Sequence, residues 1–315
     1  AFPFKLQGVI VNDPEEMLDY TYNPDATVSN LMGGQFQVFF QAVAPGDRGG
    51  TALWMAQNYQ VMGPGYAGED YGTEWTNEMR RVQYDINGRK FRKGDLIEVT
   101  ARKGLFRGGK LNINERHRIT FSNDFDVALV KANVGLPQAE ALTLADLKNP
   151  DDSAIFDATR ATGGEHWQGM RVRLDGIRLV NTNGWGKTNW SDRVCTVTDD
   201  DGRTFPLRMP LTNLAPMPAT SDVFSATGIL NQENSNTNGY ELFVQEIGPV
   251  LDLDRRTSGS MAVSFSADYE GYVLEATDDL EGGTWSAVDI TPVKLIVIED
   301  AAAASNRMYR LRKVD

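Results

Sequence analysis

The chain has 315 residues, of which 41% are hydrophobic and 23% are charged. No stretch approaches the roughly 18 to 20 uninterrupted apolar residues that a membrane-spanning helix needs. The formal net charge of -12 argues against nonspecific nucleic-acid binding, because phosphate backbones favour basic surfaces. The length favours two or three domains, and a single cysteine excludes an intramolecular disulfide.

The first 133 residues are predicted to form a β domain with long insertions. Short apolar or alternating runs between Gly, Pro, Asn and Asp are typical of strands. Such runs occur at residues 4–11, 36–43, 52–57, 96–101 and 110–114. Residues 12–35 and 58–94 interrupt them, and loops of that length in a compact domain are usually functional or involved in assembly.

Residues 134–164 are predicted to be a linker with one short helix. The run LTLADL at 142–147 follows a proline, and Thr143 with Asp146 makes a plausible N-terminal cap. A second β series then occupies 165–254, with strands expected at 170–180, 193–198, 204–209, 223–230 and 240–244. The Asp-Gly step in TDDDGR predicts a tight turn within it.

The two β series follow the same plan. GDLIEVTARKGLFRGGKLNI in the first half matches SDVFSATGILNQENSNTNGYELFV in the second in order and spacing, although few residues are identical. Five strands with a longer connection between the third and fourth are the plan of an OB-fold barrel. We therefore predict an all-β protein of two tandem OB-like five-stranded barrels. A small antiparallel β-sandwich is expected at 259–315, after the linker DLDRRTSGS.

Residues 165–248 resemble the OB-fold modules of exported bacterial proteins, some of them attached to secreted nucleases. The resemblance is carried by GEHWQGMRVRLDGIRL, VTDDDGRTFPLRM, DVFSATGIL and YELFVQEI. In such modules an acidic or aromatic residue and a glycine precede the first strand, as Glu165, Trp167 and Gly169 do here. The segment GYVLEATDDLEGGTWSAV, with the closing NRMYRLRK, resembles small C-terminal β domains of secreted and surface proteins of environmental bacteria. These resemblances imply export and a role in binding or assembly.

The first residues also favour export. The sequence opens AFPFKL without a methionine, and an N-terminal alanine is what signal-peptide cleavage often leaves. We therefore expect a mature chain that is extracellular, periplasmic or at the cell surface. A shortened chain is the alternative explanation.

No residue pattern in the chain identifies a reaction. The two histidines, His117 and His166, lie far apart in sequence and outside any metal-ligand spacing. The sequence contains neither a G-x-S-x-G elbow nor a Walker loop. Cys195 lies in the alternating stretch VCTV, which favours a buried small hydrophobe over a reactive thiol. An enzyme acting on polysaccharide or nucleic acid through scattered carboxylates remains an alternative.

No cofactor is predicted. Asp199, Asp200 and Asp201 offer the oxygen ligands that calcium prefers, but they lack the alternating spacing of a calcium loop. The glycine that follows them makes a hairpin turn the simpler interpretation. Asp151–Asp152 and Asp278–Asp279 are similarly placed at turns, and calcium at one of these aspartate sites stays an open alternative for an extracellular protein, without assignment to particular residues.

Aromatic residues in the long loops are the candidate binding residues. OB barrels bind oligonucleotides or oligosaccharides through the loops after strand one and between strands four and five. Tyrosine and tryptophan are also enriched in protein–protein interfaces. We therefore expect contact with a protein partner or self-association first, oligosaccharide second and nucleic acid third. The candidate residues are Tyr20, Tyr22, Tyr66, Tyr71, Trp75, Trp185, Lys187 and Trp190.

The leading hypothesis is an exported, non-catalytic structural or binding protein that joins a fibre, layer or complex through these loops. The second is an OB-fold module that binds single-stranded nucleic acid or oligosaccharide. One dense basic cluster could provide the local positive charge that nucleic-acid binding needs. It consists of Arg80, Arg81, Arg89, Lys90, Arg92 and Lys93.

Overall fold

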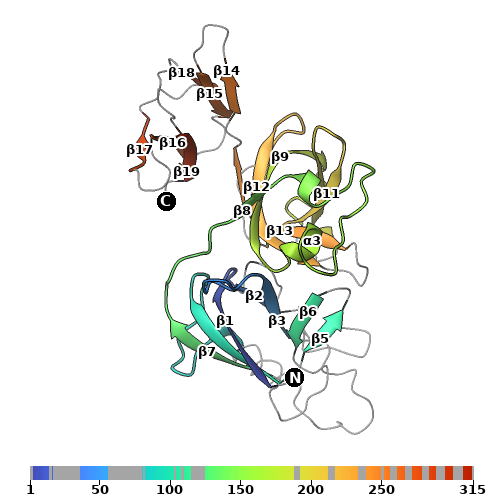
Figure 1. Cartoon of the computed structure of the whole chain (residues 1–315), viewed down its shortest axis with the longest axis vertical. Coiled ribbons are helices and arrows are strands. Elements are labelled where there is room, and N and C mark those ends of the chain that lie inside the picture. Colours follow the sequence, from blue (N-terminus) through green and yellow to red (C-terminus); the bar gives the residue numbers. More distant parts are fainter. Residues whose placement is uncertain are drawn as a thin grey trace. The chain divides into compact units, whose positions relative to one another are not determined.

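The computed structural model of the chain is nearly all β (Figure 1). It describes residues 3–13, 16, 36–55, 80, 82–102, 104–107, 110–114, 125–187, 192–211, 217–232, 239–249, 252–255, 261–266, 272–278, 284–288, 295–300 and 308–313. The chain divides into two compact units. The first comprises Ala1–Asp222 and Ala226–Glu246, and the second comprises Val223–Ser225 and Ile247–Asp315. No helix in the described residues is long and apolar enough to cross a membrane.

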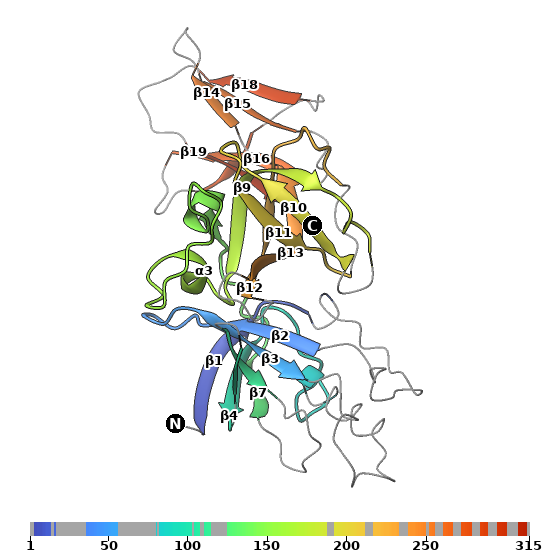
Figure 2. The same ribbon diagram turned by 90° about the vertical axis from the view of Figure 1, so that its right-hand side faces the viewer.

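The N-terminal part of the first unit is a seven-stranded sheet of order β5-β6-β3-β2-β1-β4-β7, with β5 and β6 labelled in Figure 1 and β4 in Figure 2. Neighbouring strands are antiparallel except β3 and β6, which are parallel. The strands are β1 (Phe4–Ile10), β2 (Phe36–Gln41), β3 (Gly50–Met55), β4 (Leu96–Ala101), β5 (Leu105–Arg107), β6 (Lys110–Asn114) and β7 (Phe125–Lys131).

Two strands of this sheet differ from the sequence prediction. β5 lies between the strands predicted at 96–101 and 110–114, and it pairs with β6 through Leu105 opposite Asn112 and Arg107 opposite Lys110. β7 was not predicted, although its first residue, Phe125, is fully buried and pairs with Ala101 of β4. Among the described strands, β5 and β7 are the two edge strands of this sheet, and they do not pair with each other. A first five-stranded barrel is therefore not confirmed.

The second part of the first unit is a closed five-stranded barrel. Its order is β10-β11-β13-β12-β9, and β10 pairs back with β9. β11 and β13 are parallel, with Leu207 opposite Leu242. A sixth strand, β8 (Glu140–Leu142), pairs in parallel with residues 172–174 of β9, ahead of the part of β9 that pairs with β10. The barrel strands are β9 (Arg171–Asn181), β10 (Val194–Thr198), β11 (Thr204–Arg208), β12 (Phe224–Gln232) and β13 (Tyr240–Pro249).

Alternation along the strands fills the barrel with apolar side chains. In β10, Cys195 and Val197 are fully buried while Thr196 and Thr198 are half-buried. The prediction that Cys195 is a buried hydrophobe is confirmed, and burial raises the pKa of its thiol. The apolar core of the N-terminal sheet also includes Ile229 and Phe243 from the barrel. The two β regions of the first unit therefore share one core.

The predicted turn at TDDDGR is confirmed as the hairpin between β10 and β11. The Asp199 carboxylate accepts hydrogen bonds from the backbone N–H groups of Asp201 (3.1 Å) and Arg203 (2.9 Å). The same arrangement recurs in DINGR of the first half. There the Asp85 carboxylate accepts from the N–H groups of Asn87 (2.9 Å) and Arg89 (2.8 Å). The two halves thus share a D-x-N/D-G-R turn whose side-chain oxygen organises the reversal.

The connection between the two β regions contains the predicted helix cap. Asp146 accepts hydrogen bonds from the N–H of Thr143 (2.7 Å) and from its hydroxyl (2.9 Å). The helix is only the 3-10 turn η1 (Leu144–Asp146), because the chain leaves it to pair Lys148 with Ala154. A second short helix, α3 (Gly163–His166), precedes the barrel.

The second unit contains two antiparallel three-stranded sheets, β14-β15-β18 and β17-β16-β19. Five of the six strands lie within residues 259–315, where the sequence predicted β structure. The sixth, β14, begins the segment predicted to be a linker. Packing of the two sheets as a sandwich stays a prediction. The strands are β14 (Asp252–Arg255), β15 (Met261–Ser266), β16 (Tyr272–Thr277), β17 (Ser286–Ala287), β18 (Leu295–Asp300) and β19 (Met308–Lys313).

Candidate functional site

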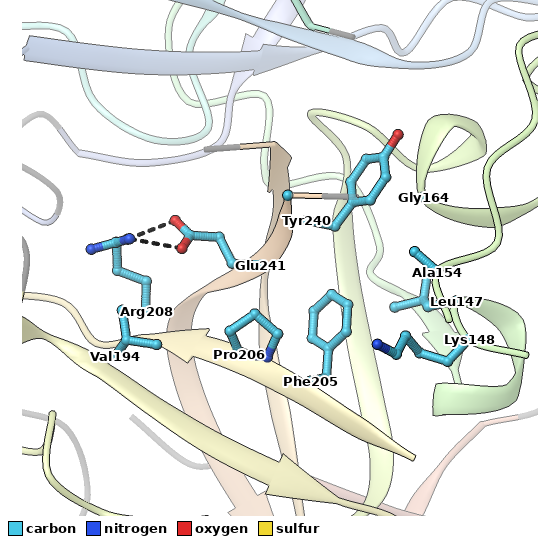
Figure 3. A pocket seen from close by; sticks show the side chains of 11 residues that line it. Leu147, Lys148, Ala154, Gly164, Val194, Phe205, Pro206, Arg208, Tyr240 and Glu241 are labelled. Carbon is cyan, nitrogen blue, oxygen red and sulfur yellow. Dashed lines mark hydrogen bonds and ion pairs between the residues drawn. The ribbon is translucent and has the colours of Figure 1, made fainter. Parts of the chain in front are cut away.

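A cavity of about 310 Å³ lies between the closed barrel and the connection that precedes it (Figure 3). The barrel contributes the first residue of β10, the strand β11 and the first residues of β13. The connection contributes residues next to η1 and α3. The lining residues are Leu147, Lys148, Ala154, Gly164, Val194, Phe205, Pro206, Arg208, Gly239, Tyr240 and Glu241.

A buried ion pair forms one end of the cavity. Arg208 donates from Nε to Glu241 Oε1 (2.6 Å) and from Nη2 to Oε2 (2.9 Å). The two side chains are only 8% and 6% exposed. The pairing follows from the strand register. Leu207 and Leu242 are opposite each other, and Arg208 and Glu241, their neighbours in sequence, both project from the other face of the sheet. The bidentate geometry compensates for the loss of water around both charges.

Tyr240 joins the barrel to α3. Its hydroxyl donates a hydrogen bond to Glu165, which is itself buried. Burial, together with the Glu165 carboxylate, raises the pKa of Tyr240 above its usual value. Gly164 packs against the Tyr240 ring so closely that a Cβ at that position would overlap it. This contact explains why the connection has a glycine at this position, and it fixes one wall of the cavity.

Asp152 joins the other side of the connection to β11. Its carboxylate accepts hydrogen bonds from the Thr204 N–H (2.8 Å) and hydroxyl (2.7 Å), and it lies 3.2 Å from the Lys148 ammonium. Burial acts to raise the pKa of Asp152, but the Thr204 and Lys148 contacts outweigh it and lower the pKa. Asp152 also has a φ of +63°, which is uncommon for a residue with a side chain. The connection is thus held in one conformation by contacts with the barrel.

The cavity lining contains charged side chains that are paired and the rings of Phe205 and Pro206. Lys148 is paired with Asp152, and Arg208 is paired with Glu241, so the lining has no uncompensated charge. The rings of Phe205 and Pro206 lie between these two polar ends (Figure 3). Such a lining combines an apolar surface with a few fixed polar groups, which is the usual composition of a small-ligand site.

Few of the predicted binding residues lie within the described part of the chain. Trp185 is half-buried and Lys187 is exposed. Both lie in the turns that follow β9. Neither lines the cavity. The loop itself leads to Val194, which does. The remaining predicted residues lie outside the described residues, namely Tyr20, Tyr22, Tyr66, Tyr71, Trp75 and Trp190.

The predicted basic cluster contains cations paired with carboxylates. Arg89 donates to Asp95 through both terminal nitrogens (2.7 and 2.9 Å), and Asp95 raises the pKa of Arg89. Lys93 lies 2.6 Å from Glu16. These pairs reduce the local positive charge that a phosphate backbone would contact.

The three residues named for the resemblance all have structural contacts. Glu165 accepts from Tyr240, and the Trp167 indole donates to Glu140 (2.9 Å), which also pairs with Arg48. Gly169 has a φ of +73° and contacts the backbone of Gly50 in the N-terminal sheet. These residues therefore position the barrel in the first unit.

Sequence reasoning did not identify the residues at the two ends of the cavity. Arg208 and Glu241 carry opposite charges next to apolar runs of two strands, FPL in β11 and LFV in β13, which is a signal of a buried pair. It becomes specific only once β11 and β13 are known to be neighbours. Lys148 had no comparable signal, because its position depends on how the connection folds back on the barrel.

No protein-family model and no curated protein matches the chain in sequence. A solved structure described as "Structural mimicry for functional antagonism" is similar over 76% of this chain and 88% of its own, with 11% identity. The TM-score is 0.29, which is too low to inform on fold or function.

Proposed function

We propose that the protein is a non-catalytic binding protein and that the cavity beside the closed barrel is its ligand site. The observation that carries this proposal is the cavity's position. It lies where the β9–β10 and β12–β13 connections enter the barrel, at Val194 and Gly239.

The strand order supports an OB-like assignment for this barrel. β9 to β13 form a closed five-stranded barrel in which the third and fifth strands are parallel. In OB folds the loops after strand one and between strands four and five bind ligands. The corresponding connections here are those that end at the cavity. The N-terminal sheet pairs five of its strands in the same order, so we propose that it is a divergent copy extended by β5 and β7.

The chemistry of the lining favours binding over catalysis. The carboxylate on the lining, Glu241, is held by Arg208, and the Tyr240 hydroxyl is held by Glu165. A catalytic acid or base has to be within reach of a substrate proton. These groups instead form contacts that hold the cavity walls together. Export and assembly through the aromatic loops remain part of the proposal, and isolation of the native protein from a culture supernatant or cell envelope would test them.

The binding role can be tested with a mixed array of oligosaccharides, single-stranded oligonucleotides and peptides. The full chain is compared with Val194→Phe, which places a larger side chain at a half-buried lining position. Ala154→Leu repeats the test from the connection side. Val180→Phe is the matched control, because Val180 is 58% exposed and does not line the cavity.

We expect array ligands that bind the wild type and Val180→Phe but not the two cavity-filling variants. If every ligand on the array binds all four proteins equally, or if none binds the wild type, the proposed function is wrong.

A further inference from the structure

We infer that the cavity takes one ring of a neutral oligosaccharide, with the ring's hydroxyl groups directed to the polar ends and its C–H face on Phe205 and Pro206. This inference rests on the proposed function, and it specifies the class of ligand.

The size of the cavity limits the ligand to a small group. About 310 Å³ is near the lower end of the roughly 300–1000 Å³ typical of small-molecule sites. A single sugar ring or one side chain fits this description better than several units of a polymer. Val194 and Gly239, where two connections enter the barrel, both line the cavity, and we place the rest of a chain-like ligand on that side.

The polar groups are placed at the two ends of the cavity. Lys148 has an ammonium with three N–H donors, and Asp152 is the carboxylate that the structure places beside it, at 3.2 Å. At the other end the Arg208–Glu241 pair presents a donor group and an acceptor group side by side. Sugar hydroxyls both donate and accept hydrogen bonds, so one ring satisfies both ends.

The apolar lining between these ends suits the C–H face of a sugar. Phe205 and Pro206 are consecutive residues of β11, and both line the cavity between its polar ends (Figure 3). A purely apolar side chain from a protein partner would cover these rings. It would also remove water from the charged ends without replacing its hydrogen bonds, which is costly.

The charge of the lining argues against anionic ligands. Both cations are neutralised by carboxylates, and the chain as a whole carries a net charge of -12. A phosphate or sulfate placed beside Glu241 would meet repulsion without a compensating free cation. Neutral glycans therefore fit better than nucleic acids or sulfated polysaccharides.

The test uses calorimetric titration of the full chain with three sets of probes. One set contains neutral oligosaccharides of two to six rings from glucan, xylan, mannan and galactan. The second contains sulfated and uronic-acid oligosaccharides, and the third contains single-stranded DNA and short peptides. Lys148→Met removes the ammonium but keeps the apolar stem, and Lys5→Met, at an exposed position in β1, is the matched control.

We expect at least one neutral oligosaccharide to bind the wild type and Lys5→Met. Its affinity should fall about tenfold in Lys148→Met, the effect of losing a hydrogen bond from a charged donor. Its binding should be abolished in Val194→Phe. Val194→Phe and Ala154→Leu are checked for folding by circular dichroism, and either one is sufficient for the blocking test.

Two results overturn the inference. If the ligand displaced by Val194→Phe is anionic, a nucleic acid or a peptide, the cavity is a binding site for another class and the proposed function stands. If no neutral oligosaccharide binds, the inference fails irrespective of other ligands. The proposed function falls as well only if no probe of any set loses its binding in a correctly folded cavity-filling variant.

Discussion

The N-terminal sheet and the closed barrel pair five strands in the same order but end differently. In the sheet the order is β4-β1-β2-β3-β6, and in the barrel it is β12-β9-β10-β11-β13. The outer strands of the barrel series, β12 and β13, pair with each other and close it. Those of the sheet pair with β7 and β5 instead. The same order of five strands therefore occurs in two architectures. They differ in the partners of the two outer strands, β12 and β13 in the barrel and β4 and β6 in the sheet.

The difference also locates the cavity. In the barrel the parallel strands β11 and β13 lie between β10 and β12. The connection that precedes the barrel folds over the ends of β11 and β13. The Arg208–Glu241 pair at one end of the cavity is buried, with 8% and 6% of the side chains exposed. In the sheet the comparable ion pair between neighbouring strands, Lys5 with Glu98, is exposed at 65% and 26%. The barrel is thus expected to depend on its charged pair much more than the sheet does.

Glu241→Ala should show the largest effect. It removes the carboxylate from a buried Arg208, and breaking a buried pair typically costs about 3–5 kcal/mol. Urea unfolding followed by tryptophan fluorescence measures the loss. The double variant Arg208→Met with Glu241→Leu should recover most of it, because apolar residues of similar size avoid the buried charge.

The matched change in the sheet is Glu98→Ala. Because Lys5 and Glu98 are exposed to solvent, we expect little change in the urea midpoint. Equal losses for Glu241→Ala and Glu98→Ala would contradict the contrast between the two regions.

Gly169→Ala tests the contact between the sheet and the barrel. A Cβ at Gly169 would overlap the backbone of Gly50, whereas one at Gly176 would meet open space. The two glycines have nearly the same φ, +73° and +71°. Gly176→Ala should therefore cost about 1–2 kcal/mol for the backbone conformation alone. Gly169→Ala should cost about 1–3 kcal/mol more from overpacking, as measured by thermal and urea unfolding.

Acid stability should depend on Asp95 of the N-terminal region. Burial acts to raise the pKa of Asp95, but the Arg89 side chain and the N–H groups of Asn133 and Arg92 outweigh it and lower the pKa. Because the folded-state pKa is below the unfolded value of about 3.9, this stabilisation is present above that pH and is lost as the pH falls through the folded-state pKa. Asp95→Asn should lower stability at pH 7 and flatten its decline below about pH 4. An unchanged acid slope in Asp95→Asn would rule out this role.

The two D-x-N/D-G-R turns give the smallest predicted difference. Asp85→Ala and Asp199→Ala each remove two backbone hydrogen bonds to a carboxylate. Asp199 also contacts Arg203 (2.9 Å). We expect both variants to be modestly destabilised and Asp199→Ala to lose up to about 1 kcal/mol more, since a partly exposed ion pair adds little. A much larger loss at Asp85 would show that the turns are not equivalent.

The sequence predicted most of the fold through local patterns. Alternation in β4 and β10, the Asp-Gly turn at 201–202 and the Thr143–Asp146 cap are all short-range signals, and the structure has each of them. Two of the strands that prediction missed, β5 and β14, lack such signals, whereas β7 has apolar residues at alternate positions (FDVALVK) and was missed all the same. β5 has three residues beside two glycines, and β14 has the charged sequence DLDR.

The cavity was not predictable in the same way. Lys148 and Tyr240 are 92 residues apart by their numbering, and only the folding of the connection against the barrel brings them to one cavity. Aromatic loops were the visible signal for binding, and most of their residues lie outside the described part of the chain. Long-range polar pairs such as Arg208–Glu241 were the better guide, but they can be read only with the strand order in hand.

Hydrogen–deuterium exchange of the full chain, with and without the tightest-binding oligosaccharide from the array, tests the central claim most directly. The account predicts slower exchange at residues 144–155, at β11 and at the start of β13, and no such change in Val194→Phe. Protection that lies entirely in other segments, or that persists in Val194→Phe, would contradict the assignment of the cavity as the binding site.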